Sequence, residues 1–229
     1  MMDYIREAMP ILLQGAVISV QLFAATLIFS LILGLPIALG ENSSFAPVRW
    51  VCKLFVFVFR GTPLMLQLFF FYFFFPIQLN IQIDAFPAAV LTFVLNYSAY
   101  FAEIYRGGLN SIDRGQYEAA HSLGVSKRQT LFDIVIPQMF RVVLPPVSNE
   151  VITLIKDTAL ASSIALADMM RVSEGMVNRD GTLIPYVLAA GMYLLFTFVV
   201  TVLLGRVERR FARYERSEEH TSELQSPSL

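Results

Sequence analysis

The sequence predicts an all-α integral membrane protein with about five transmembrane helices. Hydrophobic residues make up 56% of the 229 residues and charged residues 15%, whereas an ordinary soluble domain holds about 45–50% and 25%. Several uncharged runs are also long enough to cross the hydrocarbon core of a bilayer, which takes roughly 20 apolar residues per helix. The shortage of charge and the length of these runs together exclude an ordinary soluble domain.

Four uncharged runs predict membrane-spanning helices. Each run is bounded by acidic or basic residues, which are costly to place in the middle of a bilayer. The first run is too long for the apolar segment of a signal peptide, and no A-x-A cleavage pattern follows it, so we expect a retained helix. The four runs lie between residues 7 and 41, 60 and 84, 84 and 103, and 180 and 206.

A fifth candidate span, residues 141–168, carries Glu150, Lys156 and Asp157. On an insertion scale a central charge costs about 2.5–3.5 kcal/mol, whereas each Leu, Ile, Val or Phe returns about 0.3–0.6 kcal/mol. The three charges therefore outweigh the apolar residues of this segment. It crosses the membrane only if its charged face meets other helices or a water-filled path, which makes that face a candidate site.

The orientation follows from the distribution of basic residues. Five spans place the two termini on opposite sides, and basic residues concentrate in cytoplasmic loops. With the N-terminus outside, the inner basic residues are Arg49, Lys53, Arg106, Arg114, Lys127, Arg128, Arg141, Arg206, Arg209, Arg210 and Arg213, and the outer ones are Arg6, Arg171 and Arg179. This asymmetry predicts an extracytoplasmic N-terminus and a cytoplasmic C-terminus.

A charged stretch of about residues 111–137 then lies on the cytoplasmic side. We expect a short helix that Gly124 ends, because glycine adopts the left-handed conformation of a helix C-terminus without steric cost. Ser126 and Gln129 fit a capping box, which predicts that a second helix starts at once. Pro137 is expected to end this second helix, because it cannot donate the hydrogen bond that a continuing helix needs. The prediction is a helix, a tight bend and a helix, parallel to the membrane.

Six residues of this stretch stand at a characteristic spacing: Glu118, Ala119, Ala120, Gly124, Ile134 and Pro137. The spacing resembles the EAA loop of the permease subunits of ATP-binding-cassette (ABC) importers. One position departs from the pattern, since Ile136 stands where leucine is usual, and both side chains are apolar and of equal volume. Composition alone would equally allow an amphipathic helix lying at the membrane surface.

Further segments carry the resemblance in order along the chain: Phe59–Leu64, Gln67, Asn96, Ala99–Ile104, Arg106–Gly108, Gly115–Gln116, Pro137–Gln138 and Ser148–Glu150. They are similar to the polar amino-acid branch of these permeases, over about residues 10–214. The resemblance implies a type I ABC-importer transmembrane fold for residues 1–215 and the import of a polar amino acid. It also implies a multi-pass protein of the bacterial cytoplasmic (inner) membrane.

The resemblance further implies that residues 111–137, hereafter the coupling loop, dock on a separate ATPase subunit. Glu118 would pair with basic groups there, the small Ala119 and Ala120 would allow close approach, and Gly124 would let the loop bend. The chain has no G-x-x-x-x-G-K-[ST] phosphate-binding motif, so we expect no cofactor on it, with ATP and Mg held by the ATPase. The other implied partners are a second copy or a similar permease, an extracytoplasmic amino-acid-binding protein and the lipid bilayer, but no nucleic acid.

Polar residues in the predicted spans are candidates for a substrate path. Gly61 and Pro63 interrupt the second span and are expected to form a hinge. A polar amino acid carries an ammonium group and a carboxylate, so its site needs an acceptor, a donor and amides between them. The residues expected to line the path or to gate it are Gln67, Asn96, Tyr100, Glu150, Thr153, Lys156 and Asp157.

The same residues have a purely structural explanation. The polar groups would satisfy one another between helices, with Lys156 pairing with Glu150 or Asp157, and residues 61–63 would form a packing kink. Glu150, Thr153 and Asp157 share one helix face, because they are spaced i, i+3 and i+7. Both explanations therefore place them against neighbouring helices.

The sequence indicates neither an enzyme nor a metal site. Cys52 is the single cysteine, so a disulfide or a thiolate metal site within one chain is excluded. His121 has no second histidine at metal-binding spacing, and no set of nucleophile, base and orienting group is visible. The alternative function is an ATP-independent channel or carrier for a small polar solute, which leaves the coupling loop without a role.

The last stretch, residues 216–229, differs from everything before it. It is polar, rich in Ser and Glu and without apolar periodicity, a composition that predicts disorder. We interpret it as a non-native tail and exclude it from functional reasoning. A natural disordered tail is the alternative.

Overall fold

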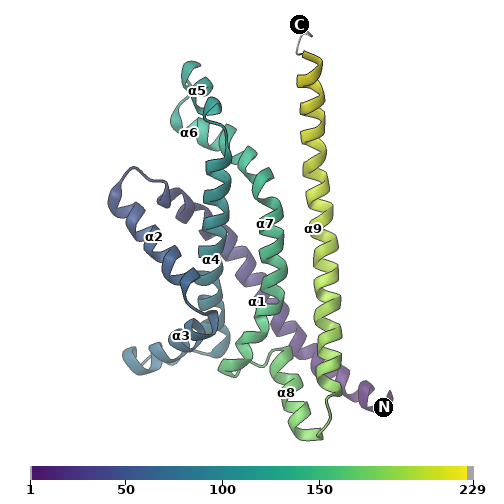
Figure 1. The fold of residues 1–229 in the computed structure, drawn as a ribbon. Helices are drawn as coiled ribbons and strands as arrows, with labels where there is room; N and C mark the ends of the chain where they lie inside the picture. Colours follow the sequence, from purple (N-terminus) through teal and green to yellow (C-terminus); the bar gives the residue numbers. More distant parts are fainter. Residues whose placement is uncertain (1, 226–229) are drawn as a thin grey trace.

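The computed structural model describes the backbone of residues 2–225 and the side chains of residues 3–211. The described chain consists of helices joined by short loops and contains no strand, which confirms the predicted fold class. The start of α1 and the end of α9 lie at opposite ends of the molecule (Figure 1), as the five predicted spans require.

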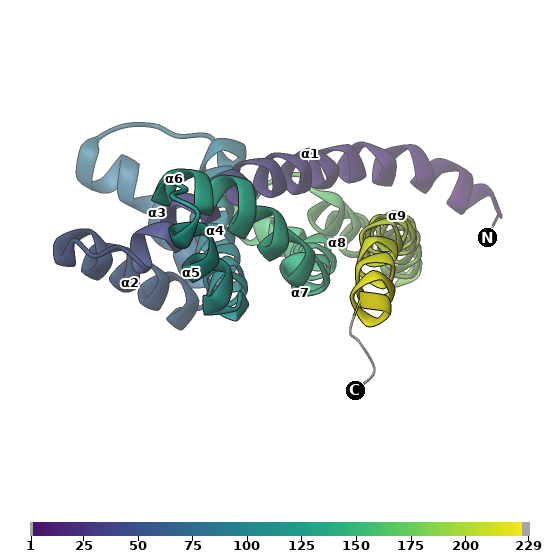
Figure 2. The ribbon, with the colours of Figure 1, turned by 90° about the horizontal axis from the view of Figure 1, so that it is seen from above.

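Four helical segments are long and apolar enough to cross a membrane: Asp3–Glu41, Ala85–Ser111, Lys127–Ile164 and Ile184–Phe211. They correspond to the helix α1 (Met2–Glu41), α4 (Ala85–Ser111), α7 (Ile136–Asp157) with the segments that flank it, and α9 (Ile184–Gln225). Among the four, α4 is the most buried and α9 the least. The helix α4 forms the centre and packs against α1 and α7, while α1 runs along one side of the row formed by α4, α7 and α9 (Figure 2).

The remaining apolar span is broken in the middle. The helices α2 (Ala46–Gly61) and α3 (Leu64–Leu79) meet at 108°, so that together they form one broken span or a re-entrant pair. The prediction that this span lies between residues 60 and 84 was wrong at its start, because Arg49 and Lys53 interrupt the apolar run although the helix continues through them. The break itself was predicted correctly. Thr62 and Pro63 are extended there, and the proline cannot donate a hydrogen bond to α2.

The prediction that Pro137 ends a helix was also wrong. The coupling loop holds the helix α5 (Arg114–Ser122), and after the bend α6 (Lys127–Gln129), the π-helical segment η1 (Thr130–Val135) and α7 form one continuous helical run. Pro137 lies where the π-helical segment η1 passes into α7, and the Ile136 amide directly before it still bonds to the Leu131 carbonyl of η1, so the run continues although the proline itself donates no hydrogen bond. The coupling loop therefore leads directly into the span that carries the predicted acidic residues.

The end of the molecule opposite the coupling loop holds a helix that was not predicted. After α7, the 3₁₀ segment η2 (Thr158–Ile164) leads to α8 (Met169–Asp180), which lies beside the N-terminal end of α1 and the start of α9 (Figure 1). The helix α8 begins at the cap Asp168, whose side chain accepts a hydrogen bond from the Arg171 amide (2.9 Å). It ends at Gly181, which has φ +64°.

The backbone of α9 continues to Gln225, so residues 216–225 are helical in the structure, whereas their composition predicted disorder. Residues 226–229 of the predicted tail lie outside the described residues. The interpretation of residues 216–229 as a non-native tail stays a prediction.

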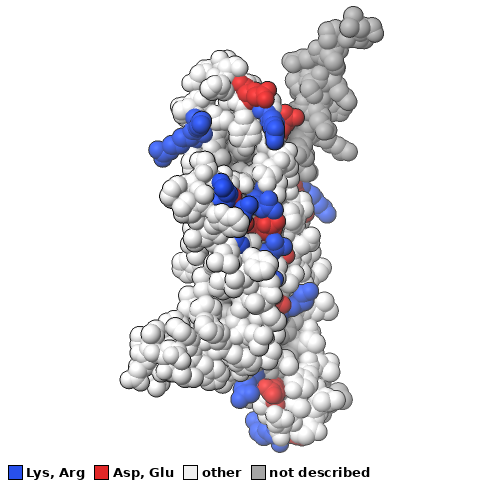
Figure 3. Space-filling view, turned by 60° about the vertical axis from the view of Figure 1, so that its left-hand side comes forward, with Lys and Arg blue, Asp and Glu red and all other residues white. Residues whose placement is uncertain are grey.

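Large apolar side chains are exposed along the helices. They include Trp50 (69% exposed), Phe57 (76%) and Leu194 (71%). On the face shown in Figure 3, charged side chains gather in a few groups and most of the surface is uncharged. Such a surface suits lipid or a second membrane protein, because monomeric soluble proteins rarely expose large contiguous apolar patches.

Candidate functional site: a polar cavity and the coupling loop

The break between α2 and α3 is held by side-chain hydrogen bonds. The last carbonyl groups of a helix have no partner within the helix and must find one elsewhere. The Gln67 Nε2 group donates to the carbonyl oxygen of Phe59 (2.9 Å) and to the carbonyl (3.1 Å) and hydroxyl (2.8 Å) oxygens of Thr62. The Thr62 hydroxyl in turn donates to the carbonyl of Val58 (2.8 Å). The two side chains thus satisfy the exposed end of α2.

Asn96 fastens this break to the central helix α4. Its Nδ2 group donates to the Phe59 carbonyl (3.0 Å) and to Oε1 of Gln67 (3.0 Å). Asn96 is 3% exposed and Gln67 8% exposed. We call Gln67 and Asn96 the amide clamp. The hydrogen bonds of both amides serve the protein itself, so these residues hold the break in place.

A cavity of about 390 Å³ lies between the break, the middle of α4 and α7. It gathers most of the residues predicted to line a substrate path or a hinge, with two exceptions. Gln67 is not part of its lining, and Lys156 is exposed elsewhere on α7. The lining residues are Arg60, Gly61, Thr62, Pro63, Leu64, Asn96, Tyr97, Tyr100, Glu150, Thr153 and Asp157.

One wall of this cavity, on α7, is acidic. The hydroxyl of the buried Tyr97 donates to Oδ2 of Asp157 (2.7 Å). The Thr153 hydroxyl donates to the Asn149 carbonyl of its own helix (3.0 Å). Glu150 has no hydrogen bond or ion pair within the described side chains, residues 3–211. The predicted pairing of Lys156 with Glu150 or Asp157 is likewise not found among them.

The opposite wall is basic. The guanidinium carbon of Arg60 lies 5.3 Å from the ring centroid of Tyr100, a distance typical of a cation–π contact. Nη1 of Arg60 is 3.8 Å from Oε2 of Glu103. Glu103 is bound more closely by Arg106, through Nε (3.0 Å) and Nη2 (2.5 Å). The cavity thus lies between a basic and an acidic wall.

The bend of the coupling loop has the local structure that the sequence predicted. Asp113 accepts a hydrogen bond from the Gly115 amide (2.6 Å) at the start of α5. Gly124 has φ +75°. Ser126 and Gln129 form the capping box, with both reciprocal hydrogen bonds at 3.3 Å. The predicted bend between two helices is confirmed.

The outer surface of the coupling loop is open. Glu118, Ala119 and Gly124 are exposed, whereas Ala120 is 3% exposed and packs within its own chain. The expectation that both alanines face a partner therefore applies to Ala119 alone. Leu123 is 82% exposed beside the bend, which suits a docking surface.

Ile134 and Pro137 lie at the base of the loop rather than on its tip. Together with Gln116 of α5 and Gln138 of α7 they line a groove of about 540 Å³. The two glutamine side chains approach each other, with Nε2 of Gln138 3.4 Å from Oε1 of Gln116. These residues therefore join α5 to α7.

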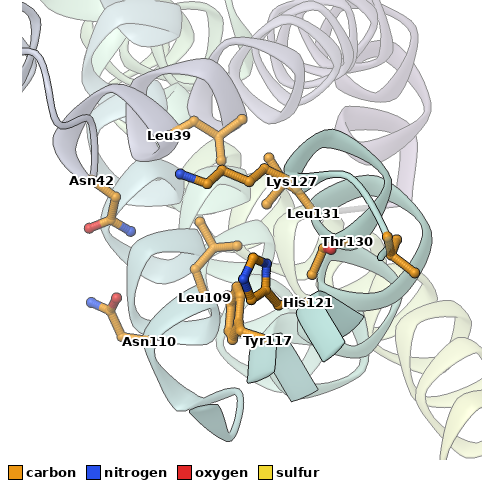
Figure 4. A pocket seen from close by; sticks show the side chains of 10 residues that line it. Leu39, Asn42, Leu109, Asn110, Tyr117, His121, Lys127, Thr130 and Leu131 are labelled. Carbon is orange, nitrogen blue, oxygen red and sulfur yellow. The ribbon is translucent and has the colours of Figure 1, made fainter. Parts of the chain in front are cut away.

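A larger cavity of about 590 Å³ lies under the coupling loop (Figure 4). Tyr117 and His121 line it from α5, and burial raises the pKa of the Tyr117 hydroxyl. Leu39 from the end of α1 and Leu109 from the end of α4 face them. None of the predicted path residues lines this cavity, so the smaller cavity at the break is the candidate substrate site.

The sequence matches the family described as "Binding-protein-dependent transport system inner membrane component" over residues 30–213. The chain belongs to this family. Curated relatives within it include the L-cystine transport system permease protein TcyB of Bacillus subtilis, 42% identical over 90% of this chain and 88% of the relative. The arginine transport system permease protein ArtQ of Bacillus subtilis is 39% identical over 88% and 92%. The glutamate/aspartate import permease protein GltK of Escherichia coli is 34% identical over 90% and 95%.

Solved structures show the same fold. A chain of an amino acid ABC transporter crystallised with histidines superposes with a TM-score of 0.83 at 34% identity and covers 90% of this chain and 97% of its own length. A chain of the MetNI methionine ABC transporter in an inward-facing conformation gives a TM-score of 0.77 at 15% identity, covering 89% and 97%. The chain thus has the type I importer fold of these permeases.

The sequence analysis did not predict three polar residues that line the cavity: Arg60, Thr62 and Tyr97. Arg60 and Thr62 belong to the segment that carries the family resemblance, directly beside the predicted break. Tyr97 stands next to the predicted Asn96. Their position next to predicted residues could have indicated them. The hydrogen bond between Tyr97 and Asp157 could not be predicted in this way, because these residues are 60 positions apart in the sequence.

Proposed function

We propose that this chain is the permease subunit of an ABC importer that moves a polar amino acid into the cytoplasm. The observation that carries the proposal is the cavity between Arg60 and Glu150, because opposed basic and acidic walls suit a zwitterion. The relatives named above are assigned to the transport of L-cystine, arginine and glutamate or aspartate. These ligands share the α-amino acid group and differ in their side chains.

In this proposal the substrate path runs through the cavity. Asn96, Tyr100, Glu150 and Thr153 line it. Gln67 supports it from behind as part of the amide clamp. Asp157 belongs to the wall, and Lys156, which lies outside the cavity, contributes to gating.

The coupling loop docks on a separate ATPase subunit, which holds ATP and Mg. The exposed Glu118, Ala119 and Gly124 form the contact surface, and Leu123 adds an apolar side chain to it. Glu118→Lys and Gly124→Asp are expected to lower transport strongly. Normal transport by both variants would favour the ATP-independent channel or carrier.

Both helices that leave the coupling loop also carry walls of the cavity. The helix α4 places Tyr100 about 16 Å from its loop end at Ser111, and α7 places Glu150 about 21 Å from Ile136, at 1.5 Å per residue. A tilt of the loop therefore moves the two walls relative to each other. This is the connection that alternating access needs, in which nucleotide-driven closure opens the site outward and hydrolysis resets it inward.

The remaining partners follow from what one chain lacks. Five spans do not enclose a path, so a second copy or a similar permease completes it, against the exposed apolar helix surfaces. An extracytoplasmic amino-acid-binding protein delivers the substrate at the end that holds α8. The assembly lies in the bacterial cytoplasmic (inner) membrane.

Assembly tests this proposal separately from transport. The chain, purified from membranes with the ATPase subunit of the same transporter, is expected to form a stable complex that Gly124→Asp weakens. Gly175→Ala, in α8 at the opposite end, is the control and is expected to leave the complex intact. If wild type forms no complex, the coupling role is wrong.

A further inference from the structure

Arg60 stands at the cavity with hydrogen-bond donors that the protein does not use. Its side chain is 40% exposed. Within the described side chains its guanidinium group makes no hydrogen bond, and its contacts are the Tyr100 ring at 5.3 Å and the Glu103 carboxylate at 3.8 Å. A guanidinium group has five N–H donors in a planar fork that matches a carboxylate. The guanidinium group of Arg60 is therefore held at the cavity, and its N–H donors have no hydrogen-bond acceptor among the described side chains.

The nearby carboxylates do not saturate it. Glu103 is already held through both oxygens by Arg106. Glu41, at the end of α1, is 6% exposed and does not line the cavity. Arg60 thus has a loose ion pair where Arg106 has a bidentate one. A carboxylate that enters the cavity would find a cation with free donors.

The start of α3 favours negative charge on the same wall. Leu64, the first residue of α3, lines the cavity next to Arg60 and Pro63. The amides of Leu66 and Gln67 bond to the Pro63 carbonyl, which marks Pro63 as the N-terminal cap of α3. The partial positive charge of a helix N-terminus attracts anions. Broken helices with this geometry bind anionic substrate groups in other transporter folds.

The opposite wall offers one free carboxylate. Asp157 accepts the Tyr97 hydroxyl, whereas Glu150 is without such a partner among residues 3–211. Glu150 and Arg60 line the same cavity, Glu150 from α7 and Arg60 from the end of α2. The two charged groups of an α-amino acid are separated by a single carbon, so a cation and an anion must face each other closely to bind both.

We infer that Arg60 binds the α-carboxylate of the transported amino acid, while Glu150 binds its α-ammonium group. This inference rests on the proposed function. It makes Arg60, and not the amide clamp, the hydrogen-bond donor to the substrate carboxylate. It defines the substrate class as α-amino acids with a free carboxylate. A carboxamide of the same amino acid would leave Arg60 without its anionic partner.

The test measures binding to the permease–ATPase complex without the binding protein, so that the binding protein's own selectivity does not enter. The probes are L-arginine, L-glutamate and L-cystine, each compared with its α-carboxamide. Wild type is expected to bind at least one of these amino acids about 10- to 100-fold more tightly than the matching carboxamide, as charge-assisted hydrogen bonds predict.

Arg60→Gln is expected to lose most of this preference by weakening binding of the amino acid, with little change for the carboxamide. Arg60→Lys keeps the positive charge but not the planar set of N–H donors, and it is expected to retain part of the preference for the amino acid over its carboxamide. Lys53→Gln, at an exposed position of α2 outside the cavity lining, is the matched control and should keep the full preference. Since the readout is a ratio, a general loss of structure does not mimic the result.

Two outcomes would overturn the inference in distinguishable ways. If wild type binds an amino acid but does not discriminate against its carboxamide, or if Arg60→Gln discriminates as well as wild type, Arg60 does not bind the carboxylate and the importer proposal stands. If wild type in the intact complex binds none of the three amino acids, the proposed site is wrong together with the inference.

Discussion

The coupling loop and the polar cavity contain similar numbers of motif residues but are held together in different ways. In the loop, contacts between near neighbours set the conformation, as in the capping box of Ser126 and Gln129. In the cavity, hydrogen bonds join distant residues, such as Asn96 to Phe59 and Tyr97 to Asp157. The loop is also exposed, while the amide clamp is buried. A change in the cavity should therefore cost stability, whereas a change in the loop should cost coupling.

Breaking the amide clamp should have the largest effect. Asn96→Leu leaves Oε1 of Gln67 without its donor, whereas the Phe59 carbonyl keeps the hydrogen bond from Nε2 of Gln67 (2.9 Å). We expect a loss of about 1–3 kcal/mol for this unsatisfied acceptor, in addition to the lost fastening of the break to α4, seen as a marked fall in the thermal unfolding temperature of the purified protein. Asn149→Leu makes the same change at an exposed side chain and should have little effect. Equal unfolding temperatures for both variants would contradict the clamp.

The crossing of α4 and α7 lies between the coupling loop and the cavity. A substitution there should have the second-largest effect on stability. A Cβ atom at Gly108 would lie 2.2 Å from Cγ1 of Val143 and 2.9 Å from Cγ of Met139, whereas at Gly107 it would meet nothing within 4 Å. Gly108→Ala is expected to lower stability by about 1–3 kcal/mol through overpacking. Gly107→Ala should be neutral or slightly stabilising, because alanine favours helix. Thermal unfolding of the pair measures the difference.

A change at the bend of the loop should separate coupling from stability. Gly124→Ala places a Cβ atom at φ +75°, which costs roughly 1–2 kcal/mol in the left-handed conformation. Because the bend is peripheral, we expect transport to fall several-fold while the unfolding temperature stays close to that of wild type. Gly175→Ala, at an open position in α8, should change neither quantity. Unchanged transport by Gly124→Ala would remove the bend from the coupling mechanism.

The smallest effect is expected at the far end, where Asp168 caps α8. Burial raises the pKa of this carboxyl to about 6, above the ordinary value of about 3.9. A raised folded-state pKa means that its contribution to stability is full below about pH 4 and is lost as the pH rises through about 6. Asp168→Asn should flatten this part of the profile, because an amide does not titrate, while its oxygen can still accept the hydrogen bond from the Arg171 amide. Unfolding temperatures between pH 4 and 7 test this, and identical profiles would contradict it.

The sequence predicted best what depends on neighbouring residues or on composition. The apolar runs predicted most of the spans, and Gly124, Ser126 and Gln129 predicted the bend with its correct chemistry. The prediction failed where packing overrides a local rule. Arg49 and Lys53 made a helix look like a loop, and Pro137 was taken as a helix end although it lies in the first turn of α7.

The sequence predicted in part which residues line the candidate site, but not what each of them does there. The family resemblance and the polar pattern pointed to Asn96, Tyr100, Glu150, Thr153 and Asp157, and the structure brings these side chains together around one cavity. Two features depend on how the elements pack: the amide side chains bond to the break, and Arg60 lines the same cavity as Glu150. No spacing along the chain contains that information.

In the proposed mechanism a separate ATPase, acting through the coupling loop, moves an amino acid that is bound in the cavity. The most direct measurement is ATP hydrolysis by this chain co-reconstituted with the ATPase subunit and the binding protein of the same transporter, titrated with single amino acids. We expect that one amino acid, or a small group of related amino acids, stimulates ATP hydrolysis and is accumulated in step with it. Accumulation without the ATPase subunit, or hydrolysis that no amino acid stimulates in an intact complex, would contradict it.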